Sequence, residues 1–181
     1  MGREFSYELI QPVAQRSEAE LQAALARLIE AGLLFCRGAP PHASYLFKHA
    51  LVQDAAYGTL LRARRQELHA RVGAVLEAHF ADLVERQSEL LAHHLMGAGE
   101  TAPAVAQWLK AGRLATARLA HVEAIAHIER GLGLLRSLSE DPARDELEVD
   151  LQLALGLASI TVKGMSFASG STGLCPRPRA F

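Results

Sequence analysis

The stretch WLKAGRLATARLAHVEAIAHI, residues 108–128, sets the fold of the second half of the chain. Gly112 follows Trp108 after four residues. Ala124 follows after twelve more residues, and Ile128 after a further four. Small residues let two antiparallel helices approach closely, while the tryptophan and isoleucine side chains fill the space between them. The spacing therefore predicts a helical hairpin that is packed through these four residues.

This spacing is typical of a tetratricopeptide repeat, and one repeat covers about residues 105–138. Gly131 stands where the pattern usually has alanine, and Arg136 where it usually has proline. The helical segments on either side fit the pattern poorly. We therefore expect a tetratricopeptide-like helical region over residues 62–162 rather than a regular array.

A pair of short helices is expected near the N-terminus. Ser17 lies three residues before Glu20, a capping-box pattern that satisfies backbone donors at a helix start. An apolar face follows, and Gly32 supplies the C-terminal stop. A shorter helix is predicted over residues 4–14, with an irregular end because of Pro12.

Two short strands are predicted after this helix pair, over residues 33–36 and 44–48, with a turn of glycine and proline between them. We expect Cys36 to be buried in the first strand, where a free thiol behaves as a small hydrophobic group. Two short helices followed by a strand pair indicate a small winged-helix-like module over residues 1–61.

The predicted fold class is mainly α, with this winged-helix-like module followed by tetratricopeptide-like helical hairpins. Further helices are expected over residues 50–60, 62–80, 88–96, 104–119, 122–138 and 146–158. Residues 163–181 form a separate segment that we expect to be disordered. Its serine, glycine and proline residues would bury too little apolar surface to offset the entropy of ordering.

The composition excludes several classes of protein. The chain has 181 residues, a formal net charge of −1 and 6% aromatic residues, unlike a strongly basic nucleic-acid-binding protein. Two cysteines are too few for a disulfide framework or a metal cage. The first residues lack the pattern of a signal peptide, and the longest apolar stretch, residues 151–160, is too short to cross a membrane. We expect a cytoplasmic protein without membrane association.

Six stretches carry a resemblance to a known family. They are GREFSYEL at residues 2–9, LQAALARLIEAGLL at 21–34, FKHALVQDAAYGTLL at 47–61, RRQELHARV at 64–72, ELLAHHL at 89–95 and DLQLALGL at 150–157. They resemble a bacterial family of multidomain STAND-type P-loop ATPases, often linked to an adenylate or guanylate cyclase domain. In this family the ATPase core is followed by a winged-helix segment and a long tetratricopeptide-like region. The resemblance covers about residues 2–164 and implies that the chain corresponds to the part after the ATPase core.

The resemblance implies a non-catalytic regulatory segment that acts through a protein partner or through an ATPase domain. The residues themselves also argue against catalysis, because no G-x-x-x-x-G-K-[ST] loop and no nucleophile constellation occur in the sequence. We therefore expect no catalytic residues, no cofactor and no metal. One alternative is that adenylate cyclase or ATP-binding activity is attributed to the chain through its family, although the catalytic parts are absent.

His49 is the candidate for nucleotide sensing, and this role comes from the resemblance. In STAND ATPases a histidine of the winged helix contacts the phosphates of the bound nucleotide. His49 has a similar place in FKHAL, although Ala50 stands where aspartate usually follows. The other interpretation is a neutral histidine that caps a helix or packs in a core.

The remaining histidines do not predict a metal site. His93 and His94 are adjacent, so on a helix their side chains point about 100° apart. His121 and His127 are six residues apart rather than the three or four that share a helix face. We expect structural or surface roles for all four.

A basic cluster leaves DNA binding through the winged helix as a second alternative, because arginines neutralise phosphates. The cluster consists of Arg62, Arg64, Arg65 and Arg71. The expected recognition helix, residues 17–32, carries three glutamates against one arginine and would repel a DNA backbone. We therefore interpret the cluster as a solvated or interdomain face.

Two further expectations concern the tail and the apolar surface. We interpret GLCPRPRAF, residues 173–181, as a family helix containing AYARAREL that is translated out of frame. We also expect the isolated chain to expose the apolar face that would meet an ATPase domain, and hence to self-associate.

Overall fold

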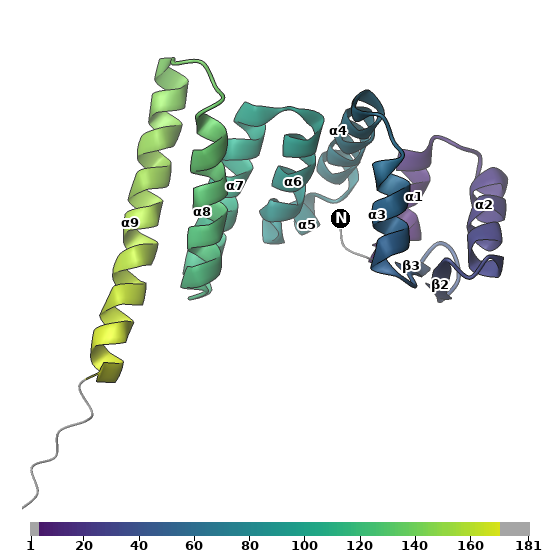
Figure 1. Cartoon of the computed structure of the whole chain (residues 1–181), viewed down its shortest axis with the longest axis horizontal. Coiled ribbons are helices and arrows are strands. Elements are labelled where there is room, and N and C mark those ends of the chain that lie inside the picture. The colour runs from purple at the N-terminus through teal and green to yellow at the C-terminus, as the bar shows by residue number, and fades with distance from the viewer. Residues whose placement is uncertain (1–3, 171–181) are drawn as a thin grey trace, which may run out of the picture. The chain divides into compact units, whose positions relative to one another are not determined.

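The computed structural model describes residues 4–170, and side chains over residues 4–161. Within this range the chain has nine helices and a small three-stranded sheet (Figure 1). The predicted fold class, mainly α with a small strand-containing module, is thereby confirmed. Two compact units make up the chain, one ending at Glu100 and the other beginning at Thr101.

The first unit contains all three strands and six of the helices of the described range. Its elements are β1 (Glu4–Ser6), α1 (Tyr7–Ala14), α2 (Glu18–Glu30), β2 (Leu34–Arg37), β3 (Ser44–Phe47), α3 (Ala50–Gly58), α4 (Arg62–His79), α5 (Ala81–Arg86) and α6 (Ser88–Ala98). The second unit consists of α7 (Thr101–Ala117), α8 (His121–Leu135) and α9 (Pro142–Gly170).

The winged-helix-like module is built from α1, α2 and an antiparallel sheet in the order β1-β3-β2. Tyr45 of β3 stands in register with Phe5 of β1 and with Cys36 of β2. The Phe5 ring stacks on Tyr45, with 5.5 Å between the ring centroids. The two helices and the sheet enclose a core of six buried residues, namely Tyr7, Leu21, Leu25, Leu34, Ala43 and Tyr45.

The start and end of α2 follow the predicted signals. The Ser17 hydroxyl accepts a hydrogen bond from the backbone of Glu20, and the Ser17 backbone donates to the Glu20 carboxylate at 3.0 Å. The Ser17 hydroxyl also donates to the Glu20 carboxylate at 2.8 Å, and this bond, together with the one from the Ser17 backbone, holds the pKa of Glu20 below its ordinary value. Gly32 has φ +71°, a left-handed conformation that favours glycine and ends the helix. The predicted capping box is confirmed.

Two expectations about this module are wrong. Residues 4–6 form β1, whereas we predicted a helix from residue 4, because their backbone pairs with β3. Ser6 then caps α1 by accepting a hydrogen bond from Leu9 N at 3.2 Å. Cys36 is exposed rather than buried, because β2 is an edge strand in which only Leu34 is buried.

Helices α4 and α6 form the main helix pair of the rest of this unit. Both contribute buried side chains, Val72 and Leu76 from α4 and Leu91 and Leu95 from α6. The short α5 that connects them has no counterpart in the sequence prediction. The boundary that we predicted after residue 61 lies inside the first unit, immediately ahead of α4.

In the second unit, α7 and α8 form a helical hairpin and α9 packs against α8 (Figure 1). Its core contains Val105, Leu109, Ile128, Leu135, Leu151 and Ala154. Helix α9 is longer than the predicted 146–158 and runs into the segment that we expected to be disordered. Residues 159–170 contain no proline to stop it. The rest of that segment, residues 171–181, lies outside the described residues, and so does the stretch 173–181 that we interpreted as translated out of frame.

No helix in the described part of the chain combines the length and hydrophobicity that crossing a bilayer requires.

Candidate functional site

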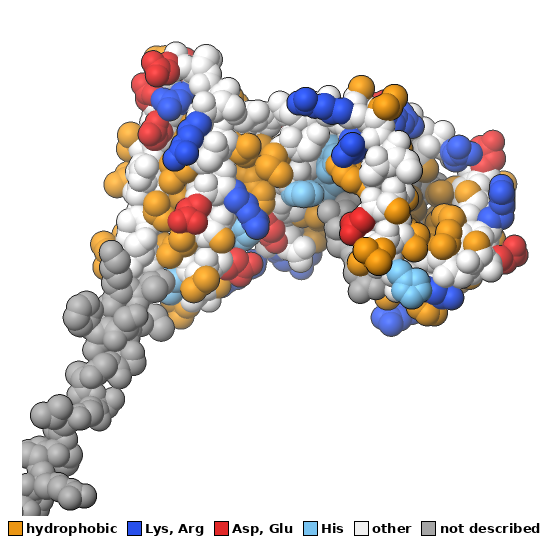
Figure 2. All heavy atoms as spheres, in the orientation of Figure 1, with side chains coloured by type: hydrophobic (Ala, Val, Ile, Leu, Met, Phe, Trp, Pro, Cys, Tyr) orange, Lys and Arg blue, Asp and Glu red, His pale blue; other side chains and the backbone are white. Residues whose placement is uncertain are grey.

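Helix α9 carries apolar side chains on two opposite faces. The inner face is buried in the second unit and contains Leu151, Ala154 and Ala158. The outer face consists of four side chains that are between 58% and 71% exposed, namely Val149, Leu153, Leu157 and Ile160. Their spacing of four, four and three residues places them along one side of the helix. Figure 2 shows hydrophobic side chains exposed along this helix.

The outer face of α9 has the properties of an uncovered packing surface. A helix at the surface of a protein normally has one apolar stripe, whereas a helix that is apolar on both sides is normally buried. Helix α9 is held in its unit by its buried inner face and by an ion pair between Arg113 of α7 and Asp150, at 3.0 Å. The helix is therefore anchored in its unit while its outer apolar stripe is free to contact another helix.

The four residues predicted to pack the repeat are brought together in the second unit. Trp108, Ala124 and Ile128 are buried, and a methyl group placed on Gly112 would lie 2.5 Å from Ile128 Cγ1. The Trp108 ring stacks on His127, with 5.4 Å between the centroids, and the guanidinium of Arg130 lies 5.1 Å from the Trp108 ring. Trp108 is thus a packing residue of the hairpin.

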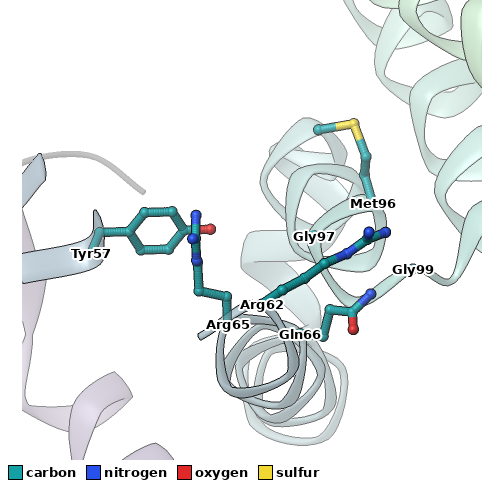
Figure 3. Close-up of a pocket in the computed structure, with 7 residues that line it drawn as sticks. All are labelled: Tyr57, Arg62, Arg65, Gln66, Met96, Gly97 and Gly99. Carbon is teal, nitrogen blue, oxygen red and sulfur yellow. The ribbon is translucent and has the colours of Figure 1, made fainter. Parts of the chain in front are cut away.

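A pocket in the first unit is formed where the end of α3, the start of α4 and the end of α6 meet (Figure 3). Its volume is about 400 Å³. The residues that line this arginine pocket are Tyr57, Arg62, Arg65, Gln66, Met96, Gly97 and Gly99. Two arginines line it and no carboxylate does, so its lining carries net positive charge.

The Arg65 side chain is fixed by two contacts. Its Nε donates a hydrogen bond to the carbonyl oxygen of Leu60 at 2.9 Å, and its guanidinium lies over the Tyr57 ring at 5.1 Å from the centroid. Figure 3 shows the Arg65 side chain beside the ring, while the Arg62 side chain extends toward Met96. The two arginines thus approach the pocket from the first turn of one helix.

Behind the pocket wall, a tyrosine and two histidines form a hydrogen-bonded chain. The Tyr57 hydroxyl lies 3.0 Å from His69 Nε2, and His69 Nδ1 lies 3.2 Å from His94 Nδ1. The His93 ring meets His69 edge-on at 5.8 Å between centroids. Burial, with a smaller contribution from the neighbouring His69 and His93, lowers the pKa of His94 to about 3. Burial also lowers the pKa of His69.

His49, the predicted nucleotide sensor, is exposed and stands at the N-cap position of α3. Its side chain makes no capping hydrogen bond to the described backbone of that helix. It does not line the arginine pocket. The nucleotide-sensing role of His49 therefore stays a prediction that rests on the resemblance.

The other predicted clusters are separated by the fold. Arg64 and Arg71 both pair with Glu67, whereas Arg62 and Arg65 line the pocket. His93 and His94 contribute to the histidine chain in the first unit, and His121 and His127 are buried in the second. Among the described residues, no three His, Cys, Asp or Glu side chains are arranged to hold a metal ion.

Comparison with known proteins gives one informative match. An uncharacterized protein from Rhizobium meliloti (strain 1021) is 31% identical to this chain over 139 residues, which are 77% of the chain. The same residues are 14% of the relative. The chain thus spans a small part of a protein that is several times longer. No protein-family model matches the chain, and no solved structure matches it.

Sequence reasoning missed the arginine pocket, the histidine chain and the outer face of α9. The pocket and the chain join residues from α3, α4 and α6, and no local spacing shows that these helices meet. The outer face of α9 was visible as Val149, Leu153 and Leu157 at helical spacing. In the sequence, however, the residues of the inner and outer faces alternate within one apolar stretch, so the two faces cannot be told apart there.

Proposed function

We propose that this chain is a non-catalytic protein-interaction segment that belongs to a larger signalling ATPase and packs a further helix onto α9. The observation that carries the proposal is the pair of apolar faces of α9, one buried and one exposed. In arrays of helical hairpins each hairpin buries its apolar face against the next, so an open stripe is the place where the next helix stacks. The occupant is therefore a helix of the longer polypeptide or of a partner protein.

Helix α3 supports the same interpretation for the first unit. None of its nine residues is buried, although it contains Leu51, which is 80% exposed, and Tyr57. An apolar helix with no buried side chain contributes little to the stability of its own unit. We propose that the α3 surface is covered by the ATPase domain that the resemblance implies.

The length of the Rhizobium relative is consistent with a segment of a multidomain protein, because the matched residues are 14% of it. The link to cyclase-associated STAND ATPases rests on the resemblance of six stretches, which include residues 47–61, 64–72 and 89–95. A regulator that binds DNA is less favoured. Helix α2 carries the exposed residues Glu18, Glu20 and Glu30, which disfavour a phosphate backbone.

The outer face of α9 can be tested through self-association of the isolated chain, because a second copy is then the available apolar partner. We expect the molar mass by light scattering to rise with protein concentration. Leu153→Glu would abolish this rise, since it places a charge in the centre of the stripe. The matched control is Gln11→Glu, which adds the same charge at an exposed position of α1, outside the stripe, and is expected to keep the wild-type behaviour.

A chain that stays monomeric over the whole concentration range, or a control that behaves as Leu153→Glu does, would contradict the docking role of this face. The non-catalytic part of the proposal is tested separately by incubating the purified chain with ATP and magnesium. We expect no release of inorganic phosphate above a protein-free control. Turnover of ATP by the chain would contradict the non-catalytic role.

A further inference from the structure

We infer that the arginine pocket binds a small molecule carrying a phosphate group, held by Arg62 and Arg65. The first reason is uncompensated charge. Arg62 and Arg65 are three residues apart and so lie on one face of α4, where like charges repel. No carboxylate of the described residues pairs with either side chain, and none lines the pocket.

The position of these arginines in the helix strengthens this argument. Both lie in the first turn of α4, where the helix dipole and the free backbone N–H groups already favour an anion. The first turn has no acidic residue, and the N-cap Leu61 makes no side-chain capping bond. Two cationic side chains therefore stand where a helix normally places negative charge. A bound dianion would relieve both the repulsion and the unfavourable position.

Arg64 provides an internal comparison, because it belongs to the same turn. Its guanidinium pairs with Glu67, and Arg71 one turn further on pairs with the same carboxylate. These two pairs lower the pKa of Glu67. The helix thus pairs its two arginines outside the pocket with one carboxylate of its own, whereas the two arginines in the pocket have no such partner among the described residues.

The geometry of Arg65 indicates a prepared site. Its Nε is committed to the carbonyl of Leu60, and its guanidinium is stacked on Tyr57, so the side chain is fixed before any ligand arrives. Tyr57 is held in turn by its hydrogen bond to His69. A side chain held in this way loses little conformational freedom on binding, which favours affinity. Gln66 adds a polar side chain to the same pocket.

Charge and volume together indicate the class of ligand. Two guanidinium groups and a helix start match the double negative charge of a phosphate better than the single charge of a carboxylate. A pocket of about 400 Å³ is large enough for a phosphorylated small molecule. The site is lined by the ends of three helices of one unit, a small patch that fits a small ligand better than an extended nucleic-acid backbone.

The test uses the full chain labelled with nitrogen-15, titrated with inorganic phosphate at constant ionic strength and followed by amide NMR shifts. We expect saturable shifts at Gly97 and Gly99, and no saturation with acetate. Arg62→Gln should weaken phosphate binding about ten-fold, as expected for the loss of one charge-assisted contact. Arg62 is exposed, so this variant should fold normally.

The matched control is Arg64→Gln, which removes one positive charge from the same helical turn outside the pocket and is expected to bind phosphate as the wild type does. Equal losses in the two variants would show a diffuse charge effect and overturn the proposal. Shifts that do not saturate, or that are the same with acetate, would overturn it as well.

Discussion

The Nδ1 atoms of His69 and His94 lie 3.2 Å apart in the contact between α4 and α6, so one imidazole donates a hydrogen and the other accepts it. Two arrangements of protons satisfy the two hydrogen bonds that link Tyr57, His69 and His94. Either Tyr57 donates to His69 and His69 donates to His94, or both bonds run in the opposite direction. In both arrangements the two imidazoles are neutral. A second proton on His94 would place a charge on a side chain that is 1% exposed.

The first prediction is that the chain loses stability as the pH falls below about 6.5. The pKa of His94 is about 3 in the folded chain, against an ordinary value of 6.5. Between these values the unfolded chain binds more protons than the folded chain, so acid favours unfolding. Protonation of His94 should lower the free energy of unfolding by on the order of 1 kcal/mol per pH unit. Urea unfolding at a series of pH values measures it.

His94→Gln removes the titrating group and should reduce the slope of the unfolding free energy against pH, although the variant is less stable at neutral pH. The control is His49→Gln, because that side chain is exposed in the folded chain. It should keep the wild-type slope. An unchanged slope in His94→Gln would show that the acid sensitivity comes from other groups.

The second prediction concerns Gly97, which lies against the same histidine. A methyl group at this position would lie 2.5 Å from His69 Nδ1, and the His69 ring is held on both sides by hydrogen bonds. Gly97→Ala should therefore destabilise the chain by about 1–3 kcal/mol. Gly73→Ala is the control, because its methyl group would meet Leu91 at an ordinary 3.7 Å. Equal stability of the two variants in thermal unfolding would contradict the tight contact.

The third prediction concerns the hairpin of α7 and α8. A methyl group on Gly112 would lie 2.5 Å from Ile128 Cγ1 and 3.4 Å from the carbonyl oxygen of Ala124. Gly112→Ala should cost about 1–3 kcal/mol, because the two helices would have to separate. Gly133→Ala in α8 meets nothing within 4 Å and should be neutral or stabilising by up to about 1 kcal/mol.

A double variant tests the same contact from the other side. Adding Ile128→Ala removes Cγ1 and Cδ1, the two Ile128 atoms at the point of overlap, so it should cost less in Gly112→Ala than in the wild type. The coupling is read from a double-mutant cycle of unfolding free energies. Additive effects would show that the two residues do not constrain one another.

The features that could be predicted from sequence are local ones. The Ser17 and Glu20 capping box lies within one helical turn, and the spacing from Trp108 to Ile128 lies within one hairpin. In both cases a few residues close in sequence carry the whole interaction. The strand β2 and its return in β3 were also predicted, because a turn rich in glycine and proline separates two apolar runs.

The features that were missed depend on contacts distant in sequence. Residues 4–6 became a strand because their backbone pairs with β3, far along the chain. Cys36 is exposed because β2 has a neighbour on one side alone, which the apolar run itself does not show. The partners His69 and His94 are 25 residues apart, and their meeting depends on how α4 and α6 pack.

The close approach at Gly112 also restricts how the helices of the second unit can slide. A helical pattern repeats about every turn, so two helices could in general shift along one another by one turn and still match. Here a shift by one turn would place Ile128 against Trp108 or Thr116, which carry side chains, instead of against Gly112, which carries none. A second close approach between helices exists at Gly131, where a methyl group would lie 3.0 Å from Leu151 Cδ2. The two glycines therefore fix the register of α7, α8 and α9, because a neighbouring side chain fits only where the glycine has none.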